Sequence, residues 1–503
     1  MFGKGFTLDA AFGGGVPVPA ADRVRLTLSS GATELSDLDP PIFRNRSDIV
    51  AAELPGNAVC VTFSAFENCT ALLSVSLPEG LSIILDSAFN NCANLRELRL
   101  PATTNLLCNS AFKDCKSLTS LAIPAGVGAV PPNMCKGCTA LVSVTLPPGV
   151  KTIGSGAFED CTSLVSITLP EGLTAIDSDA FAGCTSLVSI TFPERFTRIG
   201  KGAFYDCSSL ASIIIPEGVT CIDAFTFWHC HELESVTVPD GVTSIGENAF
   251  ADCAYLEYII LPDTVTEIGD GAFDSCTALE LISLPNNPDF VEINERTFAH
   301  CFGLKSLSIP DSVCAIGESA FEWCEKLGNT KFPVRLEEIG MCAFKDCFEL
   351  TSIVLPERVT SIGSGAFANC IYLVSVILPP SCTGIYEDAF KKCKRLTKVV
   401  ASPEMALFEY DENERDYVAR GGVGPAFPDC PQLPPNWVTP HAPVSVRAAH
   451  RLSYWTSLTH NLCHPARRKW VKFVLLVFNR LELPRVVQFI VLGQLQLYEL
   501  GKA

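Results

Sequence analysis

Apolar residues return at the same places along most of the chain, in a pattern that repeats every 23 residues. Between Cys138 and Cys161, Val144 and Leu146 are two residues apart and therefore share one face of a short strand. Pro147 follows at once and ends that strand, because proline has no amide hydrogen to donate. The pattern predicts one short parallel strand in each unit.

The second half of the unit predicts turns. Ile153 packs back into the unit, Gly154 opens a corner, and Ala157-Phe158 begins a short turn that closes on Cys161. An α-helix of normal length does not fit in this space, so we expect turns or 3₁₀ segments. The same columns run through the chain, as at Phe158, Phe181, Phe204, Cys138, Cys161, Cys184 and Cys207.

A period this strict predicts a solenoid, in which similar units stack and each contacts only its neighbours. About 17 units fit between residues 41 and 435, after an N-terminal segment at 1–40. We call the cysteine three positions after the column phenylalanine the ladder cysteine. We expect these cysteines to be buried, reduced thiols, since parallel side chains on successive rungs seldom offer the dihedral angle of a disulfide.

The unit "IGSGAFEDCTSLVSITLPEG", from Ile153 to Gly172, resembles the BspA-like, or Treponema-type, leucine-rich repeats. The resemblance covers about residues 40–435. It implies a right-handed solenoid of the leucine-rich-repeat type with a parallel sheet on its concave face. Members of the family include bacterial and parasite surface proteins that act as adhesins. The family offers no catalytic residues to carry over, so the resemblance implies binding.

The charge of the chain is divided unevenly between the repeats and the tail. Residues 1–437 contain 28 Lys and Arg against 53 Asp and Glu, whereas residues 438–503 contain 9 against 2. The solenoid is therefore acidic, which argues against nucleic acid as its partner. The tail carries a net charge of +7.

The sequence favours a cytoplasmic protein. Residues 1–6 lack the basic stretch and the apolar run of a signal peptide. The apolar run from Phe473 to Phe478 is too short to span a membrane, so we expect no transmembrane segment.

Three patterns that resemble metal or redox sites have a structural explanation. In Cys135-Lys136-Gly137-Cys138, the second cysteine belongs to the ladder and the first replaces the column phenylalanine. His460, Cys463 and His464 lack a second pair of ligands to complete a zinc site. The acidic residue before several ladder cysteines, as at Asp160, favours a turn over a calcium site. We therefore expect no cofactor, no metal and no catalytic residue.

Partner-binding residues are expected where the repeat is interrupted. The last step of the cysteine ladder is 37 residues long, which places fourteen extra residues near 404–422. This insertion carries Phe408, Tyr410 and Tyr417 among acidic residues, and insertions in solenoids often form loops that bind a partner. A disordered loop without a function is the alternative. The strand faces carry small hydroxyl residues such as Ser143 and predict a plain sheet.

Residues 436–503 differ in character from the repeats. Segments 441–462, 466–481 and 484–500 have the pattern of helices. We expect them to cover the last rung of the solenoid or to dock another protein, because an open last rung exposes a section of the core. The exposed basic and aromatic residues of this tail are further candidates for contact with a partner: Arg467, Arg468, Lys469 and Trp470.

The sequence indicates a non-catalytic scaffold that binds a protein partner, and a small-molecule substrate is not expected. Two alternatives stay open. One is a cell-surface binding protein of the adhesin type. The other is a substrate adaptor of a ubiquitin ligase, because the segment that begins at Leu483-Pro484 resembles the opening helix of an F-box.

Overall fold

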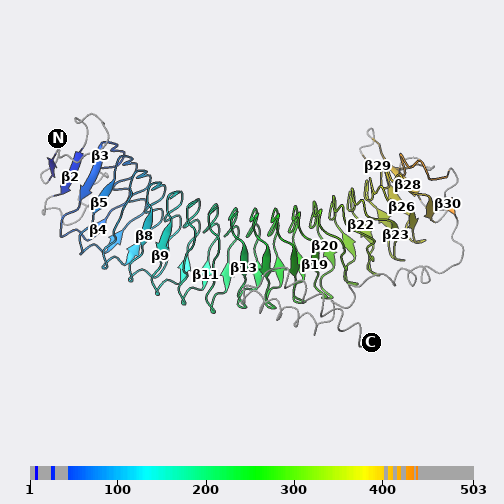
Figure 1. Cartoon of the computed structure of the whole chain (residues 1–503), viewed down its shortest axis with the longest axis horizontal. Helices are drawn as coiled ribbons and strands as arrows, with labels where there is room; N and C mark the ends of the chain where they lie inside the picture. Colours follow the sequence, from blue (N-terminus) through cyan, green and yellow to red (C-terminus); the bar gives the residue numbers. More distant parts are fainter. Residues whose placement is uncertain are drawn as a thin grey trace, which may run out of the picture. The chain divides into compact units, whose positions relative to one another are not determined.

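The computed structural model describes residues 6–9, 24–28, 43–401, 406–411, 416–420, 426–434 and 438–439. The chain divides into two compact units, Met1–Pro443 and Val444–Ala503, and all of the described residues belong to the first. Its 23-residue units form coils that lie side by side in one row (Figure 1). Neighbouring coils are joined by backbone hydrogen bonds, such as the one from Thr174 N to Lys151 O at 2.9 Å. The predicted solenoid is confirmed.

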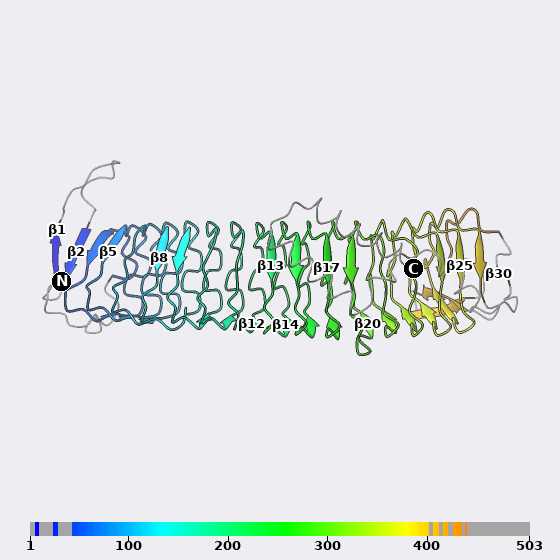
Figure 2. The same cartoon turned by 60° about the horizontal axis from the view of Figure 1, so that its bottom comes forward.

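Many coils contain two strand segments, where the sequence predicts one. The segments form two rows of parallel strands on different sides of the coils (Figure 2). The first row contains β1 (Phe6–Asp9), β2 (Val24–Leu28), β3 (Ile49–Glu53), β5 (Ser74–Ser76), β8 (Ser120–Ala122), β9 (Ser143–Thr145), β13 (Ser212–Ile214), β15 (Ser235–Thr237), β17 (Tyr258–Ile260), β19 (Leu281–Ser283), β23 (Ser352–Val354), β25 (Ser375–Ile377), β27 (Lys398–Val400) and β30 (Val438–Thr439).

The second row passes through the isoleucine column, and its strands are mostly two residues long. It contains β4 (Cys60–Val61), β6 (Ile83–Ile84), β7 (Leu106–Leu107), β10 (Thr152–Ile153), β11 (Ala175–Ile176), β12 (Arg198–Ile199), β14 (Cys221–Ile222), β16 (Ser244–Ile245), β18 (Glu267–Ile268), β20 (Glu292–Ile293), β21 (Ala315–Ile316), β22 (Glu338–Ile339), β24 (Ser361–Ile362), β26 (Gly384–Tyr386), β28 (Ala406–Asp411) and β29 (Asp416–Arg420).

Each row has an antiparallel pair at one end. β1 pairs with β2 at the start of the first row, and β28 pairs with β29 at the end of the second. The described residues contain no helix, and hence none that is long and apolar enough to cross a membrane. The helices predicted at 441–462, 466–481 and 484–500 lie outside the described residues.

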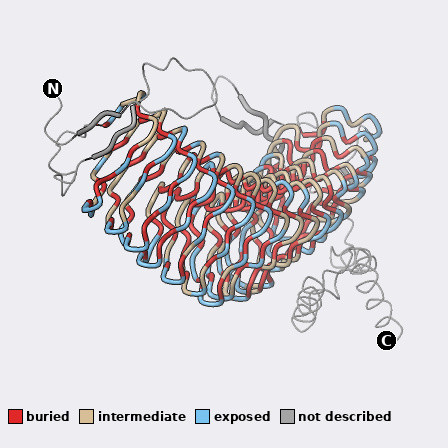
Figure 3. Tube along the Cα trace, turned by 60° about the vertical axis from the view of Figure 1, so that its left-hand side comes forward, coloured by how far each residue is buried: buried red, intermediate tan, exposed pale blue. Residues whose placement is uncertain are grey.

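Buried and exposed positions recur from coil to coil (Figure 3), and the buried residues form one hydrophobic core. Column phenylalanines stack ring on ring from coil to coil, with centroids 5.6 Å apart between Phe181 and Phe204. Ladder thiols donate hydrogen bonds to column carbonyls of the preceding coil, as Cys184 Sγ does to Phe158 O at 3.2 Å. The acceptor is a phenylalanine except for Cys161, whose Sγ donates to Cys135 O at 3.2 Å. The phenylalanine stack is interrupted at Cys135, which is itself fully buried and free. The ladder cysteines are therefore core residues that act as hydrogen-bond donors.

Burial raises the pKa of most ladder thiols. The pKa of Cys69, near the start of the stack, is raised to about 11, chiefly because burial disfavours the thiolate. Desolvation raises the pKa of Cys184 and Cys207 still further. These thiols are protonated at neutral pH, as their role as donors requires.

Two positions in most coils have a left-handed backbone conformation. One is the residue just before the ladder cysteine, as at Asp160 with φ 59°, and the other lies four residues earlier, as at Gly156 with φ 61°. Asn, Asp and Gly tolerate this conformation best, which explains why these residue types dominate both columns. The recurrent aspartate is thus a turn residue, in agreement with the sequence analysis.

Candidate functional site

The coil that contains residues 225–231 departs from the repeat at both left-handed positions. Phe225 and His229 occupy them, each with φ 60°. Bulky residues are sterically strained in this conformation. Residues with a strained backbone cluster at binding and active sites. The corner from Phe225 to His231 therefore places bulky rings where most other coils have Gly, Asn, Asp or Ser.

The rings of this corner contact one another across two coils. Trp228 meets Tyr205 edge-on, with ring centroids 5.1 Å apart, and Phe225 lies 5.2 Å away on its own coil. His229 stacks on His231 at 5.5 Å and on Tyr205 at 5.9 Å. His231 is exposed, and the other four are partly exposed. We call Tyr205, Phe225, Trp228, His229 and His231 the aromatic corner.

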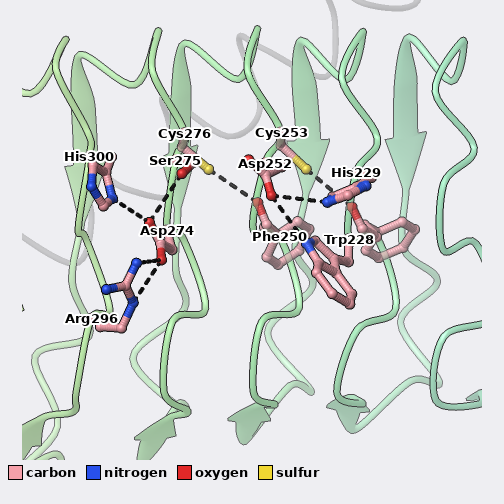
Figure 4. A network of polar contacts seen from close by, with 11 residues as sticks. Trp228, His229, Phe250, Asp252, Cys253, Asp274, Ser275, Cys276, Arg296 and His300 are labelled. Carbon is pink, nitrogen blue, oxygen red and sulfur yellow. Dashed lines mark hydrogen bonds and ion pairs between the residues drawn. The ribbon is translucent and has the colours of Figure 1, made fainter.

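The next coil holds the aromatic corner in place through one carboxylate. Trp228 Nε1 donates a hydrogen bond to Asp252 Oδ2 at 3.2 Å, and His229 Nε2 lies 3.1 Å from the same oxygen (Figure 4). Asp252 itself occupies a left-handed position, with φ 57°. The two bonds fix the orientation of both rings before any partner arrives, which lowers the entropic cost of binding.

A second polar group lies farther along the same side of the coils, as Figure 4 shows. Asp274 accepts hydrogen bonds from Arg296 Nη2 at 2.7 Å and from Ser275 Oγ at 3.1 Å. His300 Nδ1 lies 2.9 Å from Asp274 Oδ1. We call these four residues the Asp274 cluster. Arg296 and His300 occupy left-handed positions, with φ 53° and 57°, so the departure from the repeat continues here.

The same side carries further rings in the following coils. Phe302 meets His300 edge-on at 6.2 Å. Trp323 occupies a left-handed position with φ 61° and meets Phe348 edge-on at 6.1 Å. Trp, Tyr and Arg are the residues that most often dominate the energy of protein interfaces. The arrangement therefore has the composition of a binding surface.

The described residues contain no group of three or more His, Cys, Asp or Glu that could hold a metal ion. The aromatic corner and the Asp274 cluster present ring faces, hydrogen-bond donors and carboxylates to a binding partner. The stacked coils hold the backbone beneath these groups in place.

The residues proposed in the C-terminal insertion lie on a hairpin. Phe408 and Tyr410 belong to β28, Tyr417 belongs to β29, and Tyr410 is opposite Tyr417 in the register. This segment therefore extends the second row of strands, where the sequence analysis expected a loop. The role of these residues in binding stays a prediction, as does that of Arg467, Arg468, Lys469 and Trp470, which lie outside the described residues.

Sequence reasoning missed the aromatic corner, although its signal is visible in the sequence. When the units are aligned on their ladder cysteines, Phe225, His229, Arg296 and Trp323 stand in columns of small or turn-forming residues. The repeat is recognised from the residue types that each column shares. The departures from a column identify the functional candidates, because the fold does not require them.

His229→Asn is expected to raise the free energy of unfolding by up to about 1 kcal/mol, because asparagine adopts the left-handed conformation more readily than histidine. The reciprocal change Asn369→His, at the same position of an ordinary coil, is expected to lower it by a similar amount. Urea titration of both variants measures the two effects. A loss of stability in both would mean that His229 is held by its contacts without strain.

Comparison with known proteins identifies the repeat. A family model described as "BspA type Leucine rich repeat region" matches in overlapping segments that together span residues 36–411. A leucine-rich repeat protein from Bacteroides ovatus is 25% identical, over 82% of this chain and 100% of that chain, with a TM-score of 0.55. A leucine rich cell surface protein from Faecalibacterium prausnitzii is 33% identical, over 56% of this chain and 87% of that chain, with a TM-score of 0.42. No curated protein matches the chain. The chain therefore belongs to the BspA-type leucine-rich repeat family, as its 23-residue unit predicts.

Proposed function

We propose that this chain is a non-catalytic scaffold that holds a protein partner against the aromatic corner and the Asp274 cluster. The observation that carries the proposal is the placement of Phe225 and His229 at left-handed positions, where the fold favours Gly, Asn or Asp. Leucine-rich repeats are generally platforms for protein interaction, which fits a surface built on a rigid stack. A scaffold needs only this surface and the stack that supports it.

We further propose that the scaffold works in a reducing compartment such as the cytoplasm. The ladder thiols support this assignment, because their hydrogen bonds to phenylalanine carbonyls require an S–H group, as in Cys253 Sγ to Phe227 O at 3.3 Å. Cell fractionation separates this proposal from that of a cell-surface binding protein, since the latter requires the protein at the surface. The ubiquitin-ligase adaptor rests on residues outside the described part, and deletion of residues 438–503 tests it.

The test of the proposed function is proximity labelling in the native cell with the full chain and with Phe225→Ser/Trp228→Ala/His229→Asn. Hot-spot residues each contribute about 2 kcal/mol or more, so the variant is expected to lose specific neighbours with an affinity drop of at least about 30-fold. Urea titration confirms that the variant is folded.

The matched control is Ser143→Ala/Thr145→Ala/Ser166→Ala, which changes three exposed hydroxyl residues on a first-row face outside the corner. The control is expected to keep every neighbour of the full chain. If the corner variant keeps the same neighbours as the control, the corner is not the binding site and the proposed function fails.

A further inference from the structure

We propose that the aromatic corner binds a segment rich in Lys and Arg of a partner protein, with the cationic groups seated on the rings and paired with the surrounding carboxylates. This inference rests on the proposed function and names the chemistry of the partner. It follows from the distribution of charge around the corner, from a cation already seated on one of its rings, and from the rings that extend the corner along the stack.

The part of the chain that contains the aromatic corner has no Lys or Arg of its own. Residues 202–295 include no Lys or Arg, whereas they include 17 Asp and Glu. The two basic residues that border this stretch are both engaged, since Lys201 lies over the ring of Phe225 and Arg296 pairs with Asp274. Cations for the remaining carboxylates at this corner would therefore come from outside the stretch, which favours a basic partner.

The corner shows that its rings accept cations. Lys201 Nζ lies 4.9 Å from the centre of the Phe225 ring, within the range of a cation–π contact. The indole of Trp228, next to Phe225, is the side chain that binds cations best through its face. Lys201 thus makes, within the chain itself, the kind of cation–π contact that we expect a lysine of the partner to make with neighbouring rings.

Carboxylates and an exposed tyrosine lie next to the aromatic corner, where they would contact a partner segment that extends beyond its rings. The backbone N–H of Asp206 donates a hydrogen bond to Trp228 O at 2.7 Å. Glu232 is exposed and follows His231 in the sequence. In the next coil, Tyr255 donates its backbone N–H to His231 O, and its side chain is 54% exposed. Rings and carboxylates therefore occur together on three neighbouring coils, about 5 Å apart, which suits the Lys and Arg side chains of an extended segment.

Other macromolecules that could occupy the aromatic corner do not complement the negative charge around it. Nucleic acids carry dense negative charge and are repelled by 17 carboxylates in a stretch without Lys or Arg. A second copy of the same acidic surface is repelled for the same reason. A basic protein segment is the occupant that complements both the rings and the carboxylates.

The test measures binding of fluorescent octalysine to the full chain by anisotropy, with octaglutamate as the negative probe. We expect octalysine to bind more weakly as salt rises and octaglutamate not to bind. Phe225→Ser/Trp228→Ala removes two rings and no charge, and it is expected to weaken octalysine binding at least about 10-fold. Asp252→Asn is expected to weaken it several-fold, whereas Glu171→Gln, outside the acidic stretch, is expected to leave it unchanged.

Equal binding of octalysine by the full chain and by the ring variant would overturn the proposal, because the attraction would then be unspecific charge. An absence of octalysine binding would overturn it as well. If Arg467→Gln/Arg468→Gln/Lys469→Gln raises the affinity several-fold, the occupant is the chain's own basic segment, and the choice of a partner protein is wrong.

The two proposals fail separately. If octalysine does not bind but the corner variant loses its cellular neighbours, only the cationic chemistry of the partner is wrong. If octalysine binds at the corner but the cellular neighbours do not depend on it, the proposed function fails.

Discussion

Phe204→Ala is expected to lower the free energy of unfolding by about 3–5 kcal/mol, the range found for truncation of core aromatic residues. The Phe204 ring is fully buried and stacks between Phe181 at 5.6 Å and Phe227 at 5.7 Å. It also meets Phe192 edge-on at 6.0 Å. The substitution removes all of these ring contacts and leaves a cavity that the neighbouring coils cannot fill without shifting. Urea titration followed by circular dichroism measures the effect.

The matched control is Phe302→Ala, which truncates a partly exposed phenylalanine outside the column and is expected to cost less than about 1 kcal/mol. Because each coil contacts only its neighbours, the added flexibility in Phe204→Ala is expected to be greatest in the adjacent coils. Hydrogen exchange measures this spread. A uniform loss of protection along residues 43–401 would contradict the nearest-neighbour description of the stack.

The interior of the stack could be predicted almost completely from the sequence. Phe158, Cys161 and Ile153 recur at a fixed period, and each is fully buried because each faces its counterparts in the adjacent coils. An apolar side chain repeated at the same place in successive units can avoid water only by stacking on its equivalents. Period, burial and the reduced state of the ladder thiols therefore follow from one pattern.

The second row of strands could not be predicted in the same way. β10 is only two residues long, Thr152–Ile153, and an alternation of apolar and polar residues needs at least four residues to be recognised. What makes it a strand is its pairing with Ala175–Ile176 in the next coil. The pattern within a unit contains no information about that pairing.

The hairpin β28–β29 could not be predicted from the sequence for a related reason. It lies in the insertion at 404–422, which has no counterpart in the other units, so no column predicts its conformation. Its first strand pairs with β26, Ile385 being opposite Leu407, and so continues the register of the second row. The preceding coil thus provides the edge on which the inserted residues form a strand.

Raising the pH above about 9 is expected to destabilise the stack steeply, because burial raises the pKa of most ladder thiols, such as Cys69 and Cys253, above their ordinary value of 9.0. Below pH 9 the thiols are protonated in both states, and their contribution to stability is fully present. Above pH 9 the unfolded chain loses these protons while the folded chain retains them, up to about pH 11 at Cys69. Each buried thiol then lowers the free energy of unfolding by about 1.4 kcal/mol per pH unit.

Urea midpoints at pH 7, 8, 9.5 and 10.5, in the presence of a reductant, measure this dependence. Free lysine and tyrosine side chains ordinarily titrate at about pH 10 as well, so the effect of the thiols is isolated by comparing two variants. Cys253→Ala removes a fully buried ladder thiol and is expected to flatten the alkaline slope by about one proton. Cys221→Ala removes a partly exposed thiol outside the ladder, whose pKa burial raises less than that of Cys253, and is expected to change the slope less. Equal slopes in the full chain and in Cys253→Ala would mean that the buried thiols do not cause the alkaline loss of stability.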